Sequence, residues 1–260
     1  MTGQPQANHL RCEGLSIRVP GRELVTELSL SIPEGSLTAV LGKNGSGKTL
    51  TLHTLAGLRP NISGEIYLAD KAISSLNRMD IANRLGLLLQ THEDPFPVSV
   101  EEMVLMGCYA RRGMWQRESS GDIAAAEAAL QEFDLTHLSE RSVSTLSGGE
   151  RRRVALAAMR LQNPDIWLLD EPTNHLDPKH QADLFASLLR LKSEGKSIVT
   201  SLHDPSLAVR FADFALLVSG NGDWSFGPVN ELVTPERLSE LYGVPYKLLS
   251  DGDLQVLVTA

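Results

Sequence analysis

Four short apolar runs, each ended by a turn or by polar residues, recur along the chain. They are SLTAVLG (36–42), IWLLDE (166–171), SIVTSLHD (197–204) and FALLVSG (214–220). Strands that are covered on both faces are apolar throughout instead of alternating, and this is typical of parallel sheets flanked by helices. The pattern therefore predicts an α/β core built on a parallel sheet.

The N-terminal part of the chain has a different pattern, in which apolar and polar residues alternate. Residues 10–34 contain the runs LRCEGLSIRV and ELSLSI, separated by the turn PGRE and closed by PEG. Alternation interrupted by turns indicates antiparallel strands. We expect an antiparallel sheet at the edge of the core, joined by GEIYLAD at 64–70.

Residues 99–161 are dominated by helical periodicity, in SVEEMVLMG, the Ala-rich GDIAAAEAALQEF and GGERRRVALAAMRL. The preceding stretch QTHEDPFPVS holds Pro95 and Pro97, which forbid a continuous helix or a central strand. The chain is thus predicted to have three parts. Residues 1–89 form the first part of the core, 90–161 a hinge loop and an inserted helical lobe, and 162–260 the second part of the core with the C-terminal region.

The composition fits an ordinary globular protein. The 260 residues are 42% hydrophobic, which is enough for a sizeable core. No apolar run approaches the roughly 20 residues that span a bilayer, and the start MTGQPQANHLRCEG has no basic stretch followed by an apolar one. We therefore expect a soluble chain in the cytoplasm. Cys12 and Cys108 lie far apart and in no metal-ligand spacing, which argues against a disulfide framework.

The formal net charge of −8 argues against a nucleic-acid binder that relies on a basic field. No nucleic acid is expected as a partner. Any anion that the chain binds must be held by local geometry.

The stretch GKNGSGKT at 42–49 provides such a geometry. It follows an apolar run and precedes TLTLHTLAGL, whose Leu52, Leu55 and Leu58 are expected on one side of a helix. The glycines would let backbone N–H groups converge on phosphates at the positive end of that helix. A plain strand-to-helix turn would explain the glycines but neither Lys48, which suits the β- and γ-phosphates, nor Thr49, whose hydroxyl suits Mg²⁺. The candidate nucleotide-binding residues are Gly42, Lys43, Asn44, Gly45, Ser46, Gly47, Lys48 and Thr49.

Two adjacent carboxylates end the buried run IWLLDE. Asp170 is placed to hold Mg²⁺ through water. Glu171 points the other way from the strand and is the better candidate to polarise the water that attacks the γ-phosphate. The alternative is that Glu171 only caps the following turn, PTNH.

A second glycine turn, LSGGE, occupies residues 146–150. SGGE fits a capping box, in which Ser147 accepts from the N–H of Glu150 and the Glu150 side chain reaches back to the N–H of Ser147. Taken alone, capping is the favoured interpretation. The two glycines nevertheless leave N–H groups uncovered, so the following helix presents a second end that attracts anions.

These motifs occur together in one order. GKNGSGKT, Gln90, LSGGE, IWLLDE, NHLD and His203 follow one another as in the ATP-binding-cassette (ABC) ATPases, which the chain resembles over almost its whole length. The resemblance implies a P-loop NTPase (RecA-like) core with an antiparallel β subdomain and an inserted helical subdomain. In that family two cassettes pair head to tail. Ser147, Gly148 and Gly149 would thus bind the γ-phosphate of ATP held by a second copy of the chain.

The resemblance also implies roles for single side chains. Gln90 would touch Mg²⁺ or the attacking water, His203 would contact the γ-phosphate, and Asp177 of NHLD would bridge to the partner cassette. Taken alone, Gln90 would be a polar loop residue and His203 a structural histidine. ATP and Mg²⁺ are the expected cofactors. The expected catalytic residues are Glu171, His203 and Gln90, and those expected around the metal are Thr49, Gln90 and Asp170.

Two positions depart from the commonest family pattern. Glu150 stands where glutamine is more usual, but both residues satisfy the capping box. Val19 stands where an aromatic residue usually stacks on adenine, and such a platform is worth ~1–3 kcal/mol per base. We expect a lower nucleotide affinity or a weaker base selectivity.

Residues 95–122 and 231–247 resemble cassettes that serve importers of iron-siderophores, haem and vitamin B12. The resemblance implies a polytopic membrane permease subunit as partner, a substrate-binding protein that acts indirectly, and a peripheral position on the inner face of the cell membrane. The loop after Gln90 and the helical lobe would receive a helix of the permease. Met114 and Trp115 would contact that partner or lie in a solvated loop.

Two other classes of protein account for less of the sequence. A soluble ABC ATPase that works as a mechanical clamp on ribosomes or DNA is disfavoured by the single cassette, the acidic charge and the lack of a coiled-coil or basic extension. A small-molecule kinase shares only the first loop and leaves LSGGE and NHLD unexplained. Neither the cargo nor the direction of transport follows from the motifs.

Overall fold

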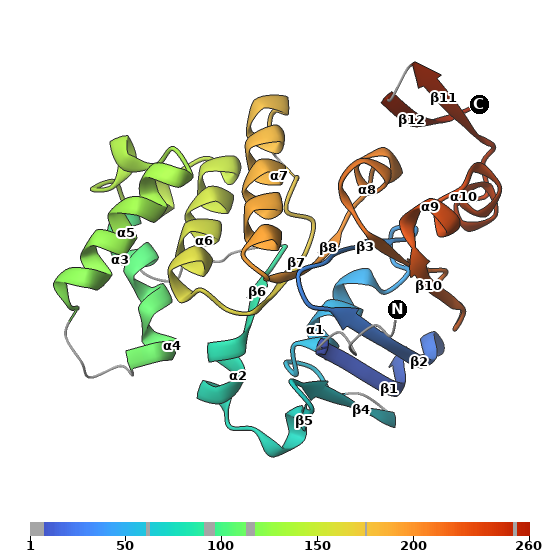
Figure 1. The fold of residues 1–260 in the computed structure, drawn as a ribbon, viewed down its shortest axis with the longest axis horizontal. Helices are drawn as coiled ribbons and strands as arrows, with labels where there is room; N and C mark the ends of the chain where they lie inside the picture. Colours follow the sequence, from blue (N-terminus) through green and yellow to red (C-terminus); the bar gives the residue numbers. More distant parts are fainter. Residues whose placement is uncertain (1–7, 61–62, 91–96, 113–117, 175, 252–253) are drawn as a thin grey trace, which may run out of the picture.

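The structure is a computed structural model that describes residues 8–60, 63–90, 97–112, 118–174, 176–251 and 254–260. Its centre is a six-stranded sheet of order β10-β9-β3-β8-β7-β6 (Figure 1). The parallel strands are β3 (Leu37–Leu41), β6 (Leu85–Leu88), β7 (Ile166–Leu169), β8 (Ser197–Ser201) and β9 (Phe214–Val218). At one edge β10 (Trp224–Pro228) pairs antiparallel with β9. The four predicted apolar runs are therefore confirmed as β3, β7, β8 and β9.

Both faces of this sheet are covered, as its apolar strands require. β3, β7 and β8 are buried at every position. Ala39 and Leu169 pack into the core beneath the helices, whereas Val40 and Leu168 pack into a second core with the antiparallel sheet. Successive residues of a strand point to opposite faces, so an all-apolar strand is stabilised only between two layers.

The N-terminal sheet has the order β2-β1-β4-β5 and is antiparallel, as predicted. Its strands are β1 (Asn8–Val19), β2 (Arg22–Pro33), β4 (Ser63–Leu68) and β5 (Lys71–Ala72). The helix α1 (Lys48–Leu55) contributes the buried Leu52 and Leu55 to the core under this sheet. The prediction for Leu58 was wrong: α1 ends at Leu55, the chain turns at Gly57 with φ 67°, and Leu58 is 60% exposed.

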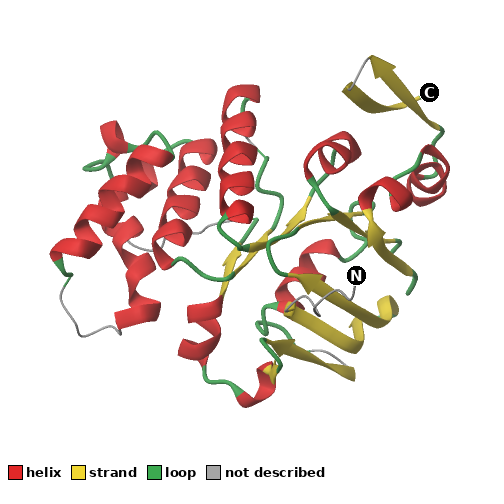
Figure 2. Ribbon diagram, in the orientation of Figure 1, coloured by secondary structure: helices red, strands yellow, loops and turns green. Residues whose placement is uncertain are grey.

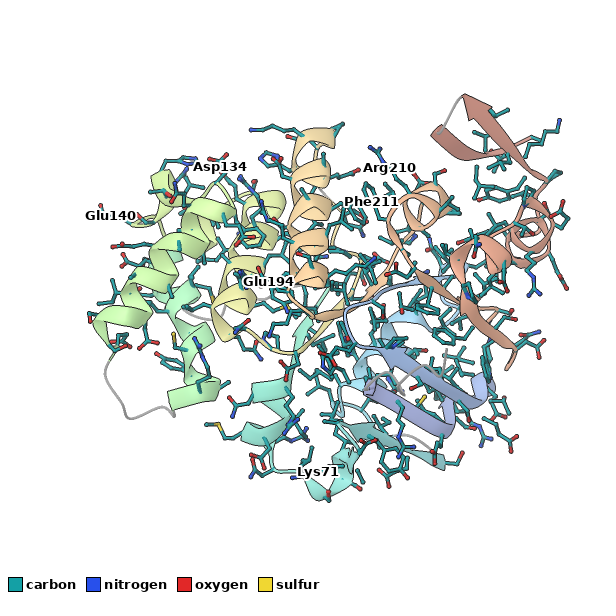
Figure 3. All side chains as sticks on the ribbon, viewed as in Figure 1. Lys71, Asp134, Glu140, Glu194, Arg210 and Phe211 are labelled. Carbon is teal, nitrogen blue, oxygen red and sulfur yellow. The ribbon has the colours of Figure 1, made fainter. Side chains whose placement is uncertain are left out.

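A block of helices lies to one side of the sheet (Figure 2), and it covers the segment expected to be helical. It contains α3 (Val100–Leu105), α4 (Tyr109–Arg112), α5 (Ser120–Glu132) and α6 (Gly148–Gln162). α7 (Pro178–Ser193) and α8 (Pro205–Phe211) pack on the central sheet. Arg160 of α6 pairs with Glu132 of α5 and with Glu194, which follows α7 and is labelled in Figure 3. The pair with Glu194 links the helical block to the core.

Several helices and strands were not predicted from the sequence. They are α2 (Arg78–Arg84), β6, β10, α9 (Val229–Leu232), α10 (Pro235–Tyr242), β11 (Tyr246–Asp251) and β12 (Leu254–Thr259). β6 pairs with β7 at the edge of the central sheet and contains Gly86. A Cβ added to Gly86 would lie 2.6 Å from Met159 Cε. Tight packing against α6 thus explains a glycine inside a strand. Cys12 and Cys108 are buried free thiols, and no described helix is long and apolar enough to cross a membrane.

Candidate nucleotide site

The loop between β3 and α1 is held in a tight turn. Ser46 N–H donates to the carbonyl of Lys43 over 3.1 Å, and Gly45 and Gly47 have φ of 73° and 107°. These left-handed conformations cost a residue with a side chain about 1 kcal/mol or more, so glycine fits both positions. A Cβ on Gly42 would lie 2.3 Å from the carbonyl oxygen of Val218, because the loop rests directly on the end of β9. The turn is therefore fixed by packing as well as by local conformation.

Lys48 folds back over this loop. Its Nζ donates to the carbonyls of Gly42 (2.8 Å) and Lys43 (3.2 Å), and the residue is only 5% exposed. Burial lowers the pKa of Lys48, while the nearby carboxylates of Glu171 and Asp170 act in the opposite direction. A buried ammonium with only carbonyl partners has capacity left for an anion.

A pocket of about 400 Å³ opens over the loop and brings together residues from distant parts of the chain. Its lining residues are Val19, Arg22, Leu24, Asn44, Gly45, Gly47, Lys48, Thr49, Leu50, Gln90 and Glu171. Backbone N–H groups at the start of α1, an ammonium and a hydroxyl form a phosphate site in such a place. Val19 and Leu24 of the β1–β2 hairpin add apolar side chains to the lining of this pocket.

Asp170 follows β7 and is completely buried. Ser201 Oγ donates to Asp170 Oδ1 over 2.8 Å, whereas Oδ2 has no hydrogen-bond partner. The buried hydroxyl of Ser46, in the phosphate loop, also lacks a partner. Buried polar atoms are normally paired, so these two oxygen atoms are suited to contact a bound ligand. Oxygen donors fit a hard cation such as Mg²⁺, and the half-buried Thr49 supplies a further hydroxyl.

Glu171 departs from the strand with φ 49°, a left-handed conformation that is strained for a residue with a side chain. Two hydrogen bonds hold it there: its N–H donates to Ser201 Oγ (2.8 Å) and its carbonyl accepts from Arg152 Nη2 (2.8 Å). Glu171 lines the pocket, whereas Asp170 is not among the lining residues and is completely buried. The divergence of the two carboxylates agrees with the expected geometry.

The Glu171 carboxylate is the centre of a polar cluster. Oε2 accepts from Gln90 Nε2 over 2.7 Å and from the amide of Asn174, and Oε1 lies 2.8 Å from His203 Nε2. The His203 side chain is 42% exposed and Glu171 is 7% exposed, and Gln90 and Glu171 of this cluster line the pocket. The structure thus brings Gln90, Glu171 and His203 together from three separate strand ends.

Arg152 is a site residue that sequence reasoning missed. It lies on α6, is 6% exposed, and donates to the carbonyls of Leu89, Asp170 and Glu171. Burial lowers its pKa, while Asp170 and Glu171 act in the opposite direction. From the sequence alone, an arginine two residues after a capping box would be expected on the helix surface. Only the position of α6 beside the ends of β6 and β7 shows that Arg152 is buried there. It ties the LSGGE helix to the carboxylates.

The LSGGE turn forms the start of α6 and contains the predicted capping box. Glu150 N–H donates to Ser147 Oγ (3.3 Å), and Ser147 N–H donates to Glu150 Oε2 (2.7 Å). The hydrogen bonds from Ser147 lower the pKa of Glu150. Asp177 in turn caps α7 by accepting from His180 N–H over 2.9 Å. Both helix starts are therefore ordered before any ligand binds.

Ser147, Gly148 and Gly149 line a second pocket, of about 370 Å³, together with Glu150, Arg153, Leu176, Asp177 and His180. None of these residues lines the pocket over the phosphate loop. Within one chain the two glycine turns therefore serve different pockets. His175 of NHLD, Pro95, Met114 and Trp115 lie outside the described residues.

The fold and the site define a P-loop ATPase with an inserted helical block. A family model described as ABC transporter matches residues 25–174. The chain belongs to this family of ABC transporter ATP-binding proteins, and it is an ATPase of that class.

Individual relatives are similar over nearly their whole length. The iron(3+)-hydroxamate import ATP-binding protein of Bacillus subtilis is 33% identical, over 94% of this chain and 91% of the relative. The hemin import ATP-binding protein of Bradyrhizobium diazoefficiens is 37% identical, over 90% of this chain and 92% of the relative. The solved structure of an inward-facing ABC transporter of the metal-chelate type has a TM-score of 0.82 at 28% identity, over 98% of this chain and 97% of that one. The expected fold class is confirmed.

Proposed function

We propose that the chain is the ATP-hydrolysing subunit of an importer for a chelate of the iron-siderophore, haem or cobalamin type. It would work at the inner face of the cell membrane with a polytopic permease, and indirectly with a substrate-binding protein. The observation that carries this proposal is near-full-length similarity to import proteins for iron(3+)-hydroxamate and hemin. The tail of the chain, absent from the family match at 25–174, is included in that similarity.

The phosphate site supports the binding of MgATP. The backbone of residues 42–49 and the ammonium of Lys48 would hold the phosphates. Thr49, Gln90 and the unpaired oxygen of Asp170 would hold Mg²⁺. When bound, Mg²⁺ neutralises negative charge on the transferring phosphoryl group.

The cluster around Glu171 would carry out ATP hydrolysis. The Glu171 carboxylate would accept a proton from the attacking water at one of its oxygens, and Gln90 would orient that water. His203, held against Oε1, would donate from its ring to the γ-phosphate and keep the carboxylate in place. Arg152 donates hydrogen bonds to the backbone carbonyls of Asp170 and Glu171. It would therefore keep the backbone of both residues, and with it both carboxylates, in a fixed position.

The separation of the two glycine turns supports a head-to-tail dimer. Ser147, Gly148 and Gly149 present N–H groups at a helix start, but their pocket shares no residue with the phosphate loop of the same chain. A second copy would bring its LSGGE turn, with Asp177 beside it, over the ATP of the first. ATP would then join the copies, and hydrolysis would release them to move the permease.

Co-purification and transport together test the function. The chain is expressed with a candidate polytopic permease subunit, and the complex is reconstituted in vesicles with ATP on the side of the cassette. We expect ATP-dependent uptake of a ferric siderophore, haem or cobalamin, and no uptake with Glu171→Gln. An ATPase that binds no membrane subunit but is stimulated by ribosomes would instead support the mechanical clamp.

A further inference from the structure

Part of the lining of the nucleotide pocket comes from the β1–β2 hairpin. Val19 and Arg22 are paired across the turn of this hairpin, and both line the pocket together with Leu24. The phosphate loop and Glu171 line the same pocket. A nucleotide whose phosphates occupy the loop therefore lies beside the hairpin, with Val19 and Arg22 in the same pocket as its base. No aromatic residue is among the described lining residues of the pocket.

The guanidinium of Arg22 is fixed in position although the residue is exposed. Its Nε donates to the carbonyl of Gly220 over 2.6 Å. Gly220 has φ 79°, and a Cβ there would lie 2.8 Å from Arg22 Nη2 and 2.7 Å from Ser46 Cα. The glycine thus lets the guanidinium approach the back of the phosphate loop. One backbone bond at Nε restrains the plane of the group, and the residue as a whole stays exposed.

Arg22 has no ion-pair partner among the described residues, in contrast to Arg18 of the same hairpin, which pairs with Glu23 at 3.5 Å. An arginine without a carboxylate partner, held at the rim of a pocket, has its charge and its planar face available for a ligand. A planar guanidinium stacks on aromatic rings and attracts their π-electrons, which an ammonium on a flexible stem does less well.

We propose that Arg22 is the platform on which the base of the bound nucleotide stacks, with Val19 as the apolar contact beside it. This role rests on the proposed nucleotide function and adds the residue that selects a base. The guanidinium replaces the aromatic ring that the pocket lacks. Arg22 therefore distinguishes a nucleoside triphosphate from a bare triphosphate.

Calorimetric binding of ATP and of inorganic triphosphate to the full chain tests the proposal. Arg22→Ala should weaken ATP binding about 3- to 30-fold, the range of a cation–π contact, and leave triphosphate binding unchanged. Arg22→Lys keeps the charge without the plane, and it should also weaken ATP selectively. Val19→Tyr in the Arg22→Ala background should restore the preference for ATP, because it provides a ring at the paired position. Arg18→Ala, which removes a charge outside the pocket, is the control and should change neither affinity.

Four results would overturn this role. Unchanged ATP binding in Arg22→Ala would show that the base does not use the guanidinium. Equal loss for ATP and triphosphate, or full retention in Arg22→Lys, would show that Arg22 acts only as a charge near the phosphates. A folded wild-type chain that binds neither probe would overturn the nucleotide function itself, and with it this role.

Discussion

Glu171 Oε1 and His203 Nε2 lie 2.8 Å apart, although the two residues follow different strands of the central sheet. The other oxygen of the same carboxylate accepts from Gln90 over 2.7 Å. Both oxygens of Glu171 are thus held by side chains at the carboxyl ends of neighbouring parallel strands. This edge of a parallel sheet is where ligands bind in α/β proteins. Because both of its oxygens are held in this way, we expect a substitution of Glu171 to affect ATP hydrolysis without affecting ATP binding.

Glu171→Gln should abolish ATP turnover while keeping ATP binding. The amide has nearly the shape of the carboxylate but accepts no proton from water, so kcat should fall by about two to four orders of magnitude. Because ATP remains bound between two copies, the variant should accumulate an ATP-dependent dimer. Phosphate release measures the turnover, and light scattering with and without ATP measures the dimer.

Glu194→Gln is a matched control for this variant. Glu194, directly after α7, pairs with Arg160 and is not among the described lining residues of the nucleotide pocket. Its loss should leave kcat at the wild-type value. Normal hydrolysis by Glu171→Gln would rule out Glu171 as the base.

Ser147→Arg should abolish hydrolysis and leave ATP binding by the monomer intact. Ser147 lines a pocket that shares no residue with the phosphate loop of its own chain, so a bulky cation there would block only the partner's ATP. Lys48→Ala should lose ATP binding outright. Mixing the two inactive variants should restore activity, since one of the two sites in the mixed dimer combines an intact Lys48 with an intact Ser147.

Activity of the mixture shows whether the LSGGE turn acts on the ATP of its own chain or on the ATP of the partner. If Ser147 acts on the ATP of its own chain, no mixed dimer has an intact site and the mixture stays inactive. In that case Ser147→Arg would also lower ATP affinity in the monomer. Phosphate release over a range of mixing ratios measures the effect.

The nucleotide loop and the parallel strands could be predicted from sequence because their signals are local. An apolar strand, three glycines, Lys48 and Thr49 follow one another within the range 36–49. The contact between Gln90, Glu171 and His203 joins three distant segments, and only their order, matched to a known family, indicated it. The capping box of Ser147 and Glu150 was visible in the sequence because its residues are three apart.

Other features depend on register or packing and leave no local signal. Arg152 reads as one of three consecutive surface arginines, yet it is buried against the ends of β6 and β7. Leu58 continues a helical pattern, but the helix ends before it. In the sequence, Arg22 is part of a stretch that predicts only a turn. The structure shows it at the pocket, where it is bonded to Gly220 next to the phosphate loop.

Arg152→Met should lower both stability and turnover. The substitution removes the hydrogen bonds to three carbonyls at strand ends, including those of Asp170 and Glu171. Buried carbonyls left without a charged donor should cost about 3 kcal/mol of unfolding free energy. Because Glu171 then loses one of the bonds that hold its strained backbone, kcat should fall at least about tenfold as well.

Urea unfolding and steady-state ATPase assays measure the two effects of Arg152→Met. Arg111→Met is the control, since Arg111 donates to the carbonyl of Leu161 in the helical block, away from the carboxylates. It should lower stability with little change in kcat. An Arg152→Met variant with wild-type kcat would show that the backbone of Glu171 is fixed without the guanidinium.

The capping box at the start of α6 should make stability depend on pH through Glu150. Hydrogen bonds from Ser147 hold the pKa of Glu150 below its ordinary value of 4.5 in the folded chain. A carboxyl with a lowered folded pKa stabilises the fold above its unfolded pKa, and this contribution is lost as the pH falls through the folded pKa. At neutral pH, Glu150→Gln should therefore cost about 0.5 kcal/mol, and Glu150→Ala about 1 kcal/mol because it also removes the cap. The difference between wild type and Glu150→Gln in urea unfolding should shrink as the pH falls through the lowered folded pKa of Glu150, below which both side chains are neutral. A difference that stays constant from neutral pH through the acid range would show that the negative charge of Glu150 contributes nothing to the start of α6.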